Sequence, residues 1–302
     1  MSDFGLLIVD KPVGPTSHQI VHIVRKGTGI RKVGHAGTLD PRASGVLVLC
    51  LGAATRLSEY LSARDKRYQA LVRFGVATTT YDSDGDVTQT GGVVPPLDTI
   101  QQALTAFRGR IEQAPPPFSA VKIQGRKAYQ LARRGEPPAL APRPVDIRRL
   151  DVIDYTPPDL ALDVECSAGT YIRTLAHDLG QTLGCGAHLS ALRRTASGEF
   201  RLEDAVPLAS LEAAFAVRPS EAPGATSGWR GYLRPAREAL GGLPVVLLSP
   251  DEVHRLRNGG RLPSSSPCDG LAQALDREGE LIAILHAAPD GGSWHPHKVF
   301  VT

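Results

Sequence analysis

The sequence is poor in cysteine, in aromatic side chains and in long apolar runs. Its four cysteines are scattered and form no C-x-x-C pair, which excludes a zinc knuckle and a disulfide framework and favours a reducing cytoplasm. The longest apolar run, Val46 to Ala54, is broken by Gly52 and is far too short to span a bilayer. No basic region precedes the short run Leu6–Val9, so we expect neither a signal peptide nor membrane association.

Nucleotide and metal motifs are also missing. The chain contains neither G-x-x-x-x-G-K-[ST] nor G-x-S-x-G, and residues 27–29 lack the third glycine and the preceding strand of a dinucleotide site. His18 and His22 would share a helix face, but no third ligand is near and Gln19 stands where a zinc protease has glutamate. We therefore expect ordinary helix histidines here and not a metal site.

Positive charge is concentrated in one segment. The whole chain has a formal net charge of +3, yet residues 108–149 contain ten Lys or Arg against three acids. Such a segment is a solvated face or an arm that binds a polyanion; interleaving with Phe118 and Tyr129 favours the arm. Proline-rich stretches at 115–117 and 137–144 border it, so we expect an insert over 114–144 with a short basic helix at Lys127–Arg134.

The periodicity of apolar residues predicts a mixture of strands and helices. We expect Thr16 or Ser17 to cap the first helix and Gly27 to end it, and Asp98 or Thr99 to cap the second. The order of elements suggests an α+β fold with a mixed, largely antiparallel sheet, not repeated βαβ units. The predicted strands are Leu6–Val9, Val46–Leu51, Tyr68–Phe74 and Leu160–Cys166, and the predicted helices are His18–Lys26, Leu97–Phe107 and Tyr171–Leu183.

Residues 216–235 are rich in Pro, Gly and Ser and mark a domain boundary. We divide the chain into a large domain at 1–212, a linker at 213–235 and a small domain at 236–302. Four short apolar stretches separated by turn residues predict a small β-barrel in the last part. Few core contacts are expected to cross the linker.

The most informative motif is the glycine-rich turn that contains Asp40. An Asp-Pro dipeptide is usually only a turn, but Gly34 and Gly37 permit a ligand to approach the backbone closely. Pro41 keeps Asp40 out of helical geometry, and the apolar strand that follows gives the turn a rigid support. The carboxylate is therefore a candidate catalytic group.

Five blocks of sequence connect this motif with a known family. They occur at residues 5–17, 32–41, 65–68, 169–175 and 186–195. In this order and spacing they resemble the TruB family of bacterial tRNA pseudouridine synthases, which act on uridine 55 in the T-loop. The resemblance extends over residues 5–212 and continues weakly to the C-terminus, where the last domain resembles a PUA-type RNA-binding barrel. It implies a pseudouridine-synthase fold.

The resemblance assigns catalytic roles to three residues. Asp40 matches the nucleophilic aspartate of the family, and Arg173 matches the arginine that pairs with it. Tyr68 matches the tyrosine that stacks on the flipped pyrimidine and takes part in proton transfer. The implied reaction breaks the C1′–N1 bond and joins C1′ to C5, so it requires no cofactor.

Further matches imply substrate contacts. His35 matches the histidine that inserts into the T-loop, while Tyr171 and Leu192 match residues that line the base pocket. Lys11 belongs to the first block, which supports the active-site strand, and it is a further candidate substrate contact. The motif around Lys122, Arg126 and Tyr129 matches the mobile arm that closes over the T-stem-loop. The implied ligand of the whole basic segment is the RNA phosphates, and its candidate contacts are Lys122, Arg126, Lys127, Tyr129, Arg133 and Arg134.

Three functions remain open on the sequence: a stand-alone tRNA uridine-55 isomerase, an RNA chaperone that binds and releases tRNA, and the guide-RNA-dependent relative that works in a multiprotein particle. The combination of Asp40, Tyr68 and Arg173 favours an enzyme, because a pure binder would not require an intact aspartate. The long basic insert favours the stand-alone type. We expect a cytoplasmic monomer that binds tRNA and requires no protein partner.

Overall fold

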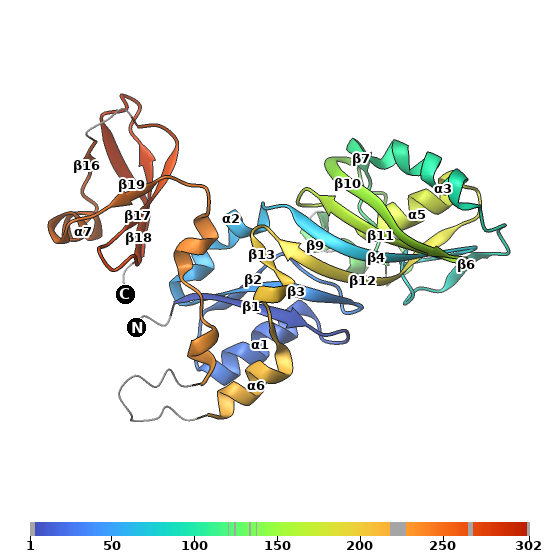
Figure 1. The fold of residues 1–302 in the computed structure, drawn as a ribbon, viewed down its shortest axis with the longest axis horizontal. Coiled ribbons are helices and arrows are strands. Elements are labelled where there is room, and N and C mark those ends of the chain that lie inside the picture. Colours follow the sequence, from blue (N-terminus) through green and yellow to red (C-terminus); the bar gives the residue numbers. More distant parts are fainter. Residues whose placement is uncertain are drawn as a thin grey trace.

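The computed structural model describes residues 4–119, 121–123, 125–132, 134–136, 138–217, 228–264 and 268–300. Most of the chain forms one large sheet with helices on its faces, and a smaller sheet near the C-terminus lies at one end of the molecule (Figure 1). The large sheet has ten strands, with the central order β14-β1-β3-β12-β4-β11-β10-β7. Within the described part of this sheet, only β1–β14 and β3–β12 pair in parallel, so the predicted α+β fold with a mixed, largely antiparallel sheet is confirmed.

The strands of the large sheet come from distant parts of the chain. Two small hairpins, β5–β6 and β8–β9, lie outside it. The strands are β1 (Gly5–Lys11), β2 (Val33–Ala36), β3 (Ala43–Leu51), β4 (Lys66–Phe74), β5 (Val76–Thr78), β6 (Val87–Thr90), β7 (Gly109–Gln113), β8 (Lys122–Ile123), β9 (Arg126–Lys127), β10 (Arg143–Thr156), β11 (Asp159–Cys166), β12 (Ala187–Ser197), β13 (Phe200–Arg201) and β14 (Val206–Pro207).

The described helices are short. The α-helices are α1 (Ser17–Thr28), α2 (Ser58–Ser62), α3 (Leu97–Leu104), α4 (Ala128–Ala132), α5 (Ile172–Thr182), α6 (Leu208–Ala216) and α7 (Pro250–Arg257). The 3₁₀ turns are η1 (Gly52–Leu57), η2 (Thr105–Phe107), η3 (Leu202–Asp204), η4 (Gly228–Tyr232) and η5 (Ala236–Leu240).

Helix α1 shows which residues begin and end a helix in this chain. Its N-cap is Thr16 as predicted, and the side chains of Thr16 and Gln19 each accept a hydrogen bond from the other's backbone N–H. The predicted end at Gly27 is wrong: the helix continues to Thr28 and ends at Gly29, whose φ is +74°. Gly27 serves packing instead, because a Cβ there would collide with the ring of Phe215 on α6.

The predicted cap of α3 is also wrong. The residue before the helix is Pro96, which makes no side-chain cap, and Asp98 and Thr99 lie inside the first turn. Asp98 still places a negative charge near the helix N-terminus, where the backbone dipole is favourable for it. The helical pattern of residues 97–107 is real, but its last turn is the 3₁₀ segment η2.

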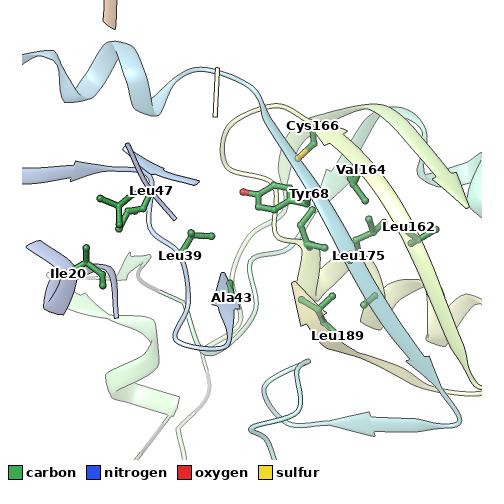
Figure 2. Packing of buried hydrophobic residues seen from close by; sticks show 14 of the residues in the cluster. Ile20, Leu39, Ala43, Leu47, Tyr68, Leu162, Val164, Cys166, Leu175 and Leu189 are labelled. Atoms are coloured by element: carbon green, nitrogen blue, oxygen red, sulfur yellow. The ribbon is translucent and has the colours of Figure 1, made fainter. Parts of the chain in front are cut away.

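The burial of β1 and β3 explains their unbroken apolar sequences. On one face, Leu7 and Leu49 belong to a core cluster that also contains residues of α1, α5 and α6. On the other face, Ile8 and Val48 belong to a second cluster with residues of α2 and η5. Strands covered on both faces need apolar side chains at every position. Strand β4, by contrast, alternates, and its buried side chains pack in the first cluster with Leu162, Val164 and Leu175 (Figure 2).

The small C-terminal sheet packs firmly on the large domain. It contains β15 (Val245–Leu247), β16 (Leu262–Pro263), β17 (Leu271–Leu275), β18 (Leu281–Ala287) and β19 (Ser293–Val299), in the order β15-β17-β18-β19-β16. The expectation of few core contacts across the boundary is wrong. Ile284 and Phe300 share a buried cluster with Leu6 and Val48, and the rings of Phe4 and Phe300 stack with centroids 6.1 Å apart.

The predicted linker is packed wherever it is described. Trp229 of η4 is buried in the core of the large domain, and the backbones of Leu6 and Arg234 exchange hydrogen bonds. Residues 218–227 of the predicted linker lie outside the described part of the chain. The domain boundaries at 212 and 236 stay predictions, but the C-terminal sheet is docked on the large domain and is not a loosely tethered unit.

Two observations concern only the part of the chain that the structure describes. None of its helices combines the length and the apolar character that crossing a membrane would need. Within the same residues, His, Cys, Asp and Glu side chains form no group of three suited to a metal ion. The four cysteines are free thiols, and Cys50 and Cys166 are buried as expected.

Candidate active site around Asp40

The turn that presents Asp40 connects β2 to β3 and is held from both sides. The N–H of Ala43 donates to the carbonyl of Asp40 (3.0 Å), and the N–H of Gly14 donates to the carbonyl of Pro41 (2.8 Å). The hydroxyl of Ser17 accepts from the N–H of Leu39 and donates to its carbonyl. The backbone is thus fixed, while the side chain of Asp40 remains 43% exposed.

Arg173 meets the Asp40 carboxylate from α5. Its Nη2 lies 3.0 Å from Oδ2 of Asp40, and its side chain is 9% exposed. The guanidinium also donates to the carbonyls of Thr80 (3.2 Å) and Phe118 (3.1 Å). The pairing implied by the family resemblance is therefore present, and the main-chain contacts fix the direction of the guanidinium fork.

Asp82 is a second carboxylate on Arg173, and the sequence did not single it out. Its Oδ2 lies 3.5 Å from Nη1 of Arg173, and its Oδ1 accepts from the hydroxyl of Thr80 (2.5 Å) and the N–H of Asp84 (3.1 Å). Arg173 therefore lies between a buried and a half-exposed carboxylate. Nothing in the sequence distinguished Asp82 from the neighbouring acids Asp84 and Asp86.

The loop that carries Asp82 contains a strained residue. Tyr81 has a φ of +64°, a conformation that non-glycine residues rarely adopt. Its ring stacks on His177 with a centroid distance of 3.8 Å, and its carbonyl accepts from the N–H of Leu189 (3.0 Å). These contacts hold the strained backbone beside the candidate site.

Two buried cations lie beneath the Asp40 turn. Nζ of Lys11 donates to the carbonyls of Ala43 (2.7 Å) and Pro12 (2.9 Å), so this residue holds the turn from below. Burial lowers the pKa of Lys11 to about 8, against the opposing attraction of Asp40. Arg194 donates from Nε to the carbonyl of Val46 (2.7 Å) and from Nη2 to that of Gly37 (3.1 Å).

The sequence placed Lys11 among substrate contacts and gave Arg194 no role. The structure buries both side chains completely or almost so, on main-chain acceptors of the turn. Arg194 lies in the last matched block, but two adjacent arginines give no sign of which one is buried. Its neighbour Arg193 is partly exposed and pairs with Asp10 at 2.8 Å.

Tyr68 projects from β4 toward the Asp40 turn. Its ring is buried, and Figure 2 shows the hydroxyl directed toward the segment with Leu39 and away from Val164. Residue 68 is the cross-strand partner of Arg194 on β12. Burial raises the pKa of Tyr68, an effect that the Arg194 guanidinium partly opposes, so the phenol is neutral near pH 7.

Tyr171 and His35 flank elements that carry the site: Tyr171 precedes α5 and His35 lies on β2, before the Asp40 turn. The backbone of Tyr171 exchanges two hydrogen bonds with the side chain of Gln113, which fixes the start of α5. Burial raises the pKa of Tyr171. His35 lies on β2, and burial, together with the charges of His18 and Arg194, lowers its pKa. Its imidazole is therefore predominantly neutral near pH 7.

The cavity at Asp40 is narrow. It has a volume of about 20 Å³ and is bounded by Asp40, Asp82, Arg173 and Leu192, among others. That space suits a single water molecule. A second, open cavity of about 360 Å³ shares the wall made by Arg42 and Leu192. A ligand larger than a water molecule that reaches Asp40 must therefore displace some of the cavity wall.

The basic insert begins beside this cavity, where the carbonyls of Ala114 and Phe118 accept hydrogen bonds from Thr174 and Arg173. Its described core is the β8–β9 hairpin and α4, where the N–H of Tyr129 donates to the carbonyl of Ser119 (3.0 Å). Arg126 and Arg134 are exposed to solvent. The side chains of Lys122 and Lys127, and all of Arg133, lie outside the described structure.

Comparisons with known proteins agree over nearly the whole chain. The model of the TruB family pseudouridylate synthase N-terminal domain matches residues 25–172, and that of the tRNA pseudouridylate synthase B C-terminal domain matches residues 173–240. The tRNA pseudouridine synthase B of Thiobacillus denitrificans is 45% identical over 99% of this chain and 96% of its own length. That of Pseudomonas aeruginosa is 42% identical over 95% and 93%.

Two solved structures share the fold. A chain from a Cbf5-Nop10-Gar1 complex aligns with a TM-score of 0.75 and 30% identity, covering 99% of this chain and 85% of its own. A chain from an H/ACA RNP bound to a substrate RNA containing 2′-deoxyuridine aligns with a TM-score of 0.74 and 29% identity, over 99% and 86%. Together with the full-length relatives, these matches show that the chain belongs to the TruB family of pseudouridylate synthases.

Proposed function

We propose that the protein isomerises uridine 55 in the T-loop of tRNA to pseudouridine. One observation carries the proposal: Asp40 is held 3.0 Å from the buried Arg173. This pair occurs in a chain that is 45% identical to a tRNA pseudouridine synthase B over nearly its full length.

Asp40 is the proposed nucleophile. The reaction breaks the C1′–N1 bond, turns the base and joins C1′ to C5, so the substrate and product have the same atoms and the same oxidation state. A carboxylate can form a covalent intermediate of this kind without a cofactor. Attack on C6, attack on C1′ and a glycal route all begin from the same carboxylate, which Arg173 orients through its fixed fork.

The target uridine has to leave the stack before Asp40 can reach it. A flipped base regains roughly 1–3 kcal/mol by stacking on an aromatic ring, and Tyr68, which points toward the Asp40 turn, is the proposed ring. Its neutral hydroxyl is available for proton transfer. Tyr171 and Leu192 would form the walls that yield to the base. A neutral His35 would fill space in the T-loop without adding a charge.

The exposed cations of the basic insert are the proposed phosphate contacts. Arg126 and Arg134 can bind phosphates without first breaking a buried contact, because both are exposed. Lys122, Lys127, Tyr129 and Arg133 belong to the same proposal. The C-terminal sheet is proposed to add affinity for tRNA beyond the T-arm. We further propose that the protein acts in the cytoplasm, as a monomer and without a protein partner.

The test is the activity of the purified protein on an unmodified T-arm hairpin with nothing added. We expect conversion of one uridine, the one that corresponds to position 55. Tight binding without conversion would instead favour an RNA chaperone.

A guide-dependent enzyme is the second candidate, because the solved structures with TM-scores of 0.75 and 0.74 come from Cbf5 and H/ACA RNP complexes. Conversion that appears only when a guide RNA and further proteins are supplied would select that candidate. The full-length identity to bacterial tRNA enzymes favours the stand-alone reaction.

A further inference from the structure

Arg42 combines a rigid backbone with an exposed charged side chain at the mouth of the Asp40 cavity. It lies two residues after Asp40 in the same turn, which hydrogen bonds from Ala43 and Gly14 hold in place. Its side chain is nevertheless 57% exposed. The turn therefore fixes the backbone from which this side chain extends, while the partner of its guanidinium can change.

The protein engages Arg42 only in part. Nε lies 2.5 Å from Oδ1 of Asp84, whose own side chain is 45% exposed. Within the described residues the two Nη groups have no protein partner, so the outer half of the guanidinium fork faces solvent. Exposed ion pairs add little to stability, so a competing anion can replace Asp84 at small cost.

The location of Arg42 suits a phosphate next to the flipped nucleotide. Arg42 borders both the small cavity that contains Asp40 and the open cavity of about 360 Å³. A base inserted toward Asp40 leaves its ribose and phosphates outside, where the two cavities meet. A guanidinium binds phosphate oxygens through two parallel N–H groups, and the free Nη groups provide them.

The carboxylates near the mouth of the Asp40 cavity explain why Asp84 is paired in the free protein. Asp82, Asp84 and Asp86 occur within five residues, and unpaired carboxylates at the mouth of an RNA site would repel phosphates. Arg42 neutralises Asp84, and the backbone N–H of Asp84 is held by the carboxylate of Asp82. Asp82 in turn contacts Arg173, so this turn and the catalytic pair are mechanically connected.

We propose that Arg42 exchanges partners when RNA binds: it releases Asp84 and binds a phosphate that flanks the flipped uridine. The inference rests on the proposed function in that the RNA is the substrate, and it adds a residue that anchors the reacting nucleotide. Asp84 acts as a substitute anion that is displaced into solvent. Arg42 is a binding residue and takes no part in bond breaking.

The test compares wild type and Arg42→Ala on T-arm hairpins that carry a single neutral methylphosphonate on either side of the target uridine. We expect Arg42→Ala to bind the natural hairpin about tenfold more weakly. At one of the two positions, the neutral linkage should weaken wild-type binding by a similar factor and leave Arg42→Ala unchanged. An equal loss in both proteins at both positions would overturn the proposal.

Three further variants sharpen the test. Asp84→Asn removes the competing carboxylate and should bind the natural hairpin about two- to threefold more tightly. Arg42→Lys should recover only part of the affinity, because an ammonium lacks the fork. Arg73→Ala is the matched control. Arg73 lies near the end of β4, is 49% exposed and pairs with Asp159 of β11. The Arg73→Ala variant should therefore respond to the neutral linkage as wild type does.

The same samples separate this inference from the proposed function. Conversion of the hairpin by wild type is recorded beside its binding. A hairpin that is bound but never converted would contradict the proposed function and leave the Arg42 comparison valid. Binding by Asp84→Asn that is weaker than wild type would contradict the exchange of partners.

Discussion

Cations beneath the Asp40 turn and cations on the basic insert have opposite surroundings. Lys11 and Arg194 are buried, and main-chain carbonyls of the turn accept their hydrogen bonds. Arg126 and Arg134 of the insert are exposed. Counting charges along the sequence treats all four alike, yet the first pair holds the backbone of the site, and the second pair is open to the phosphates that we propose as its ligand. Burial, not charge, decides which role a cation has.

Arg173 and Arg42 lie between these extremes. Arg173 is buried like the supporting cations, but its fork faces a carboxylate that is 43% exposed. Arg42 is exposed like the cations of the insert, but it is attached to the rigid turn. The comparison therefore predicts that substitutions at different cations affect different properties: stability for some, chemistry or binding for others.

The largest effect is expected for Arg194→Met. The change leaves the carbonyls of Gly37, Thr38 and Val46 without their donor, and each unsatisfied buried acceptor costs about 1–3 kcal/mol. We expect the free energy of unfolding, measured in urea, to fall by at least about 3 kcal/mol, and we expect activity to be lost. Arg126→Ala, the exposed control, should stay within about 0.5 kcal/mol of wild type. Equal stability of both variants would contradict the comparison.

Arg173→Ala is expected to affect chemistry more than binding. Its partner is Asp40 and not the phosphate backbone, so we expect kcat to fall about a hundredfold or more while hairpin affinity changes little. Arg173→Lys should recover only part of the rate, because an ammonium cannot reproduce the planar fork. Single-turnover rates and equilibrium binding, measured on the same hairpin, check both statements. Full activity of the Lys variant would argue against a specific Arg–Asp geometry.

Neutralising the insert should affect binding and leave the fold intact. With Arg126, Lys127, Arg133 and Arg134 changed together, the slope of log K against log salt should fall by about 3 to 4 units, if all four contact phosphates. The free energy of unfolding should remain close to that of wild type. An unchanged slope would show that the insert is only a solvated basic face.

The smallest effect concerns the response of stability to pH. Burial lowers the pKa of Lys11 to about 8, below that of the unfolded chain, so the unfolded state binds more protons between about pH 8 and 10.5. The destabilisation due to the buried charge is complete below this range and disappears across it. Wild type should therefore gain stability relative to Lys11→Met as the pH rises from 8, by at most about 1.4 kcal/mol per pH unit. A constant difference between the two proteins would contradict a lowered pKa.

Local patterns were enough to predict much of the fold. The apolar runs in β1 and β3, the alternation in β4 and β11, and the cap of α1 all depend on residues close in sequence. The end of α1 was misplaced because the role of Gly27 is set by Phe215, which is nearly two hundred residues away. Strand β10 carries many charged side chains and was not predicted, since it pairs with β7 and β11 while much of its surface remains exposed.

The candidate site was predictable only as far as sequence motifs reach. The Asp40 turn and its pairing with Arg173 followed from the family resemblance. Arg194 and Asp82 were missed because their roles depend on register and on loop contacts. Strand β12 lies between β3 and β4, and only this pairing brings Arg194 beneath the turn and beside Tyr68.

The central claim is that Asp40 performs the chemistry while affinity resides elsewhere. The most direct measurement compares wild type and Asp40→Asn for pseudouridine formation and for binding on one T-arm hairpin. The amide keeps the shape of the side chain and removes its nucleophilic charge, whereas affinity depends mainly on phosphate contacts. We expect no detectable pseudouridine and an affinity within about twofold of wild type. Turnover by Asp40→Asn at a tenth of the wild-type rate or more would contradict the assignment of Asp40 as the nucleophile.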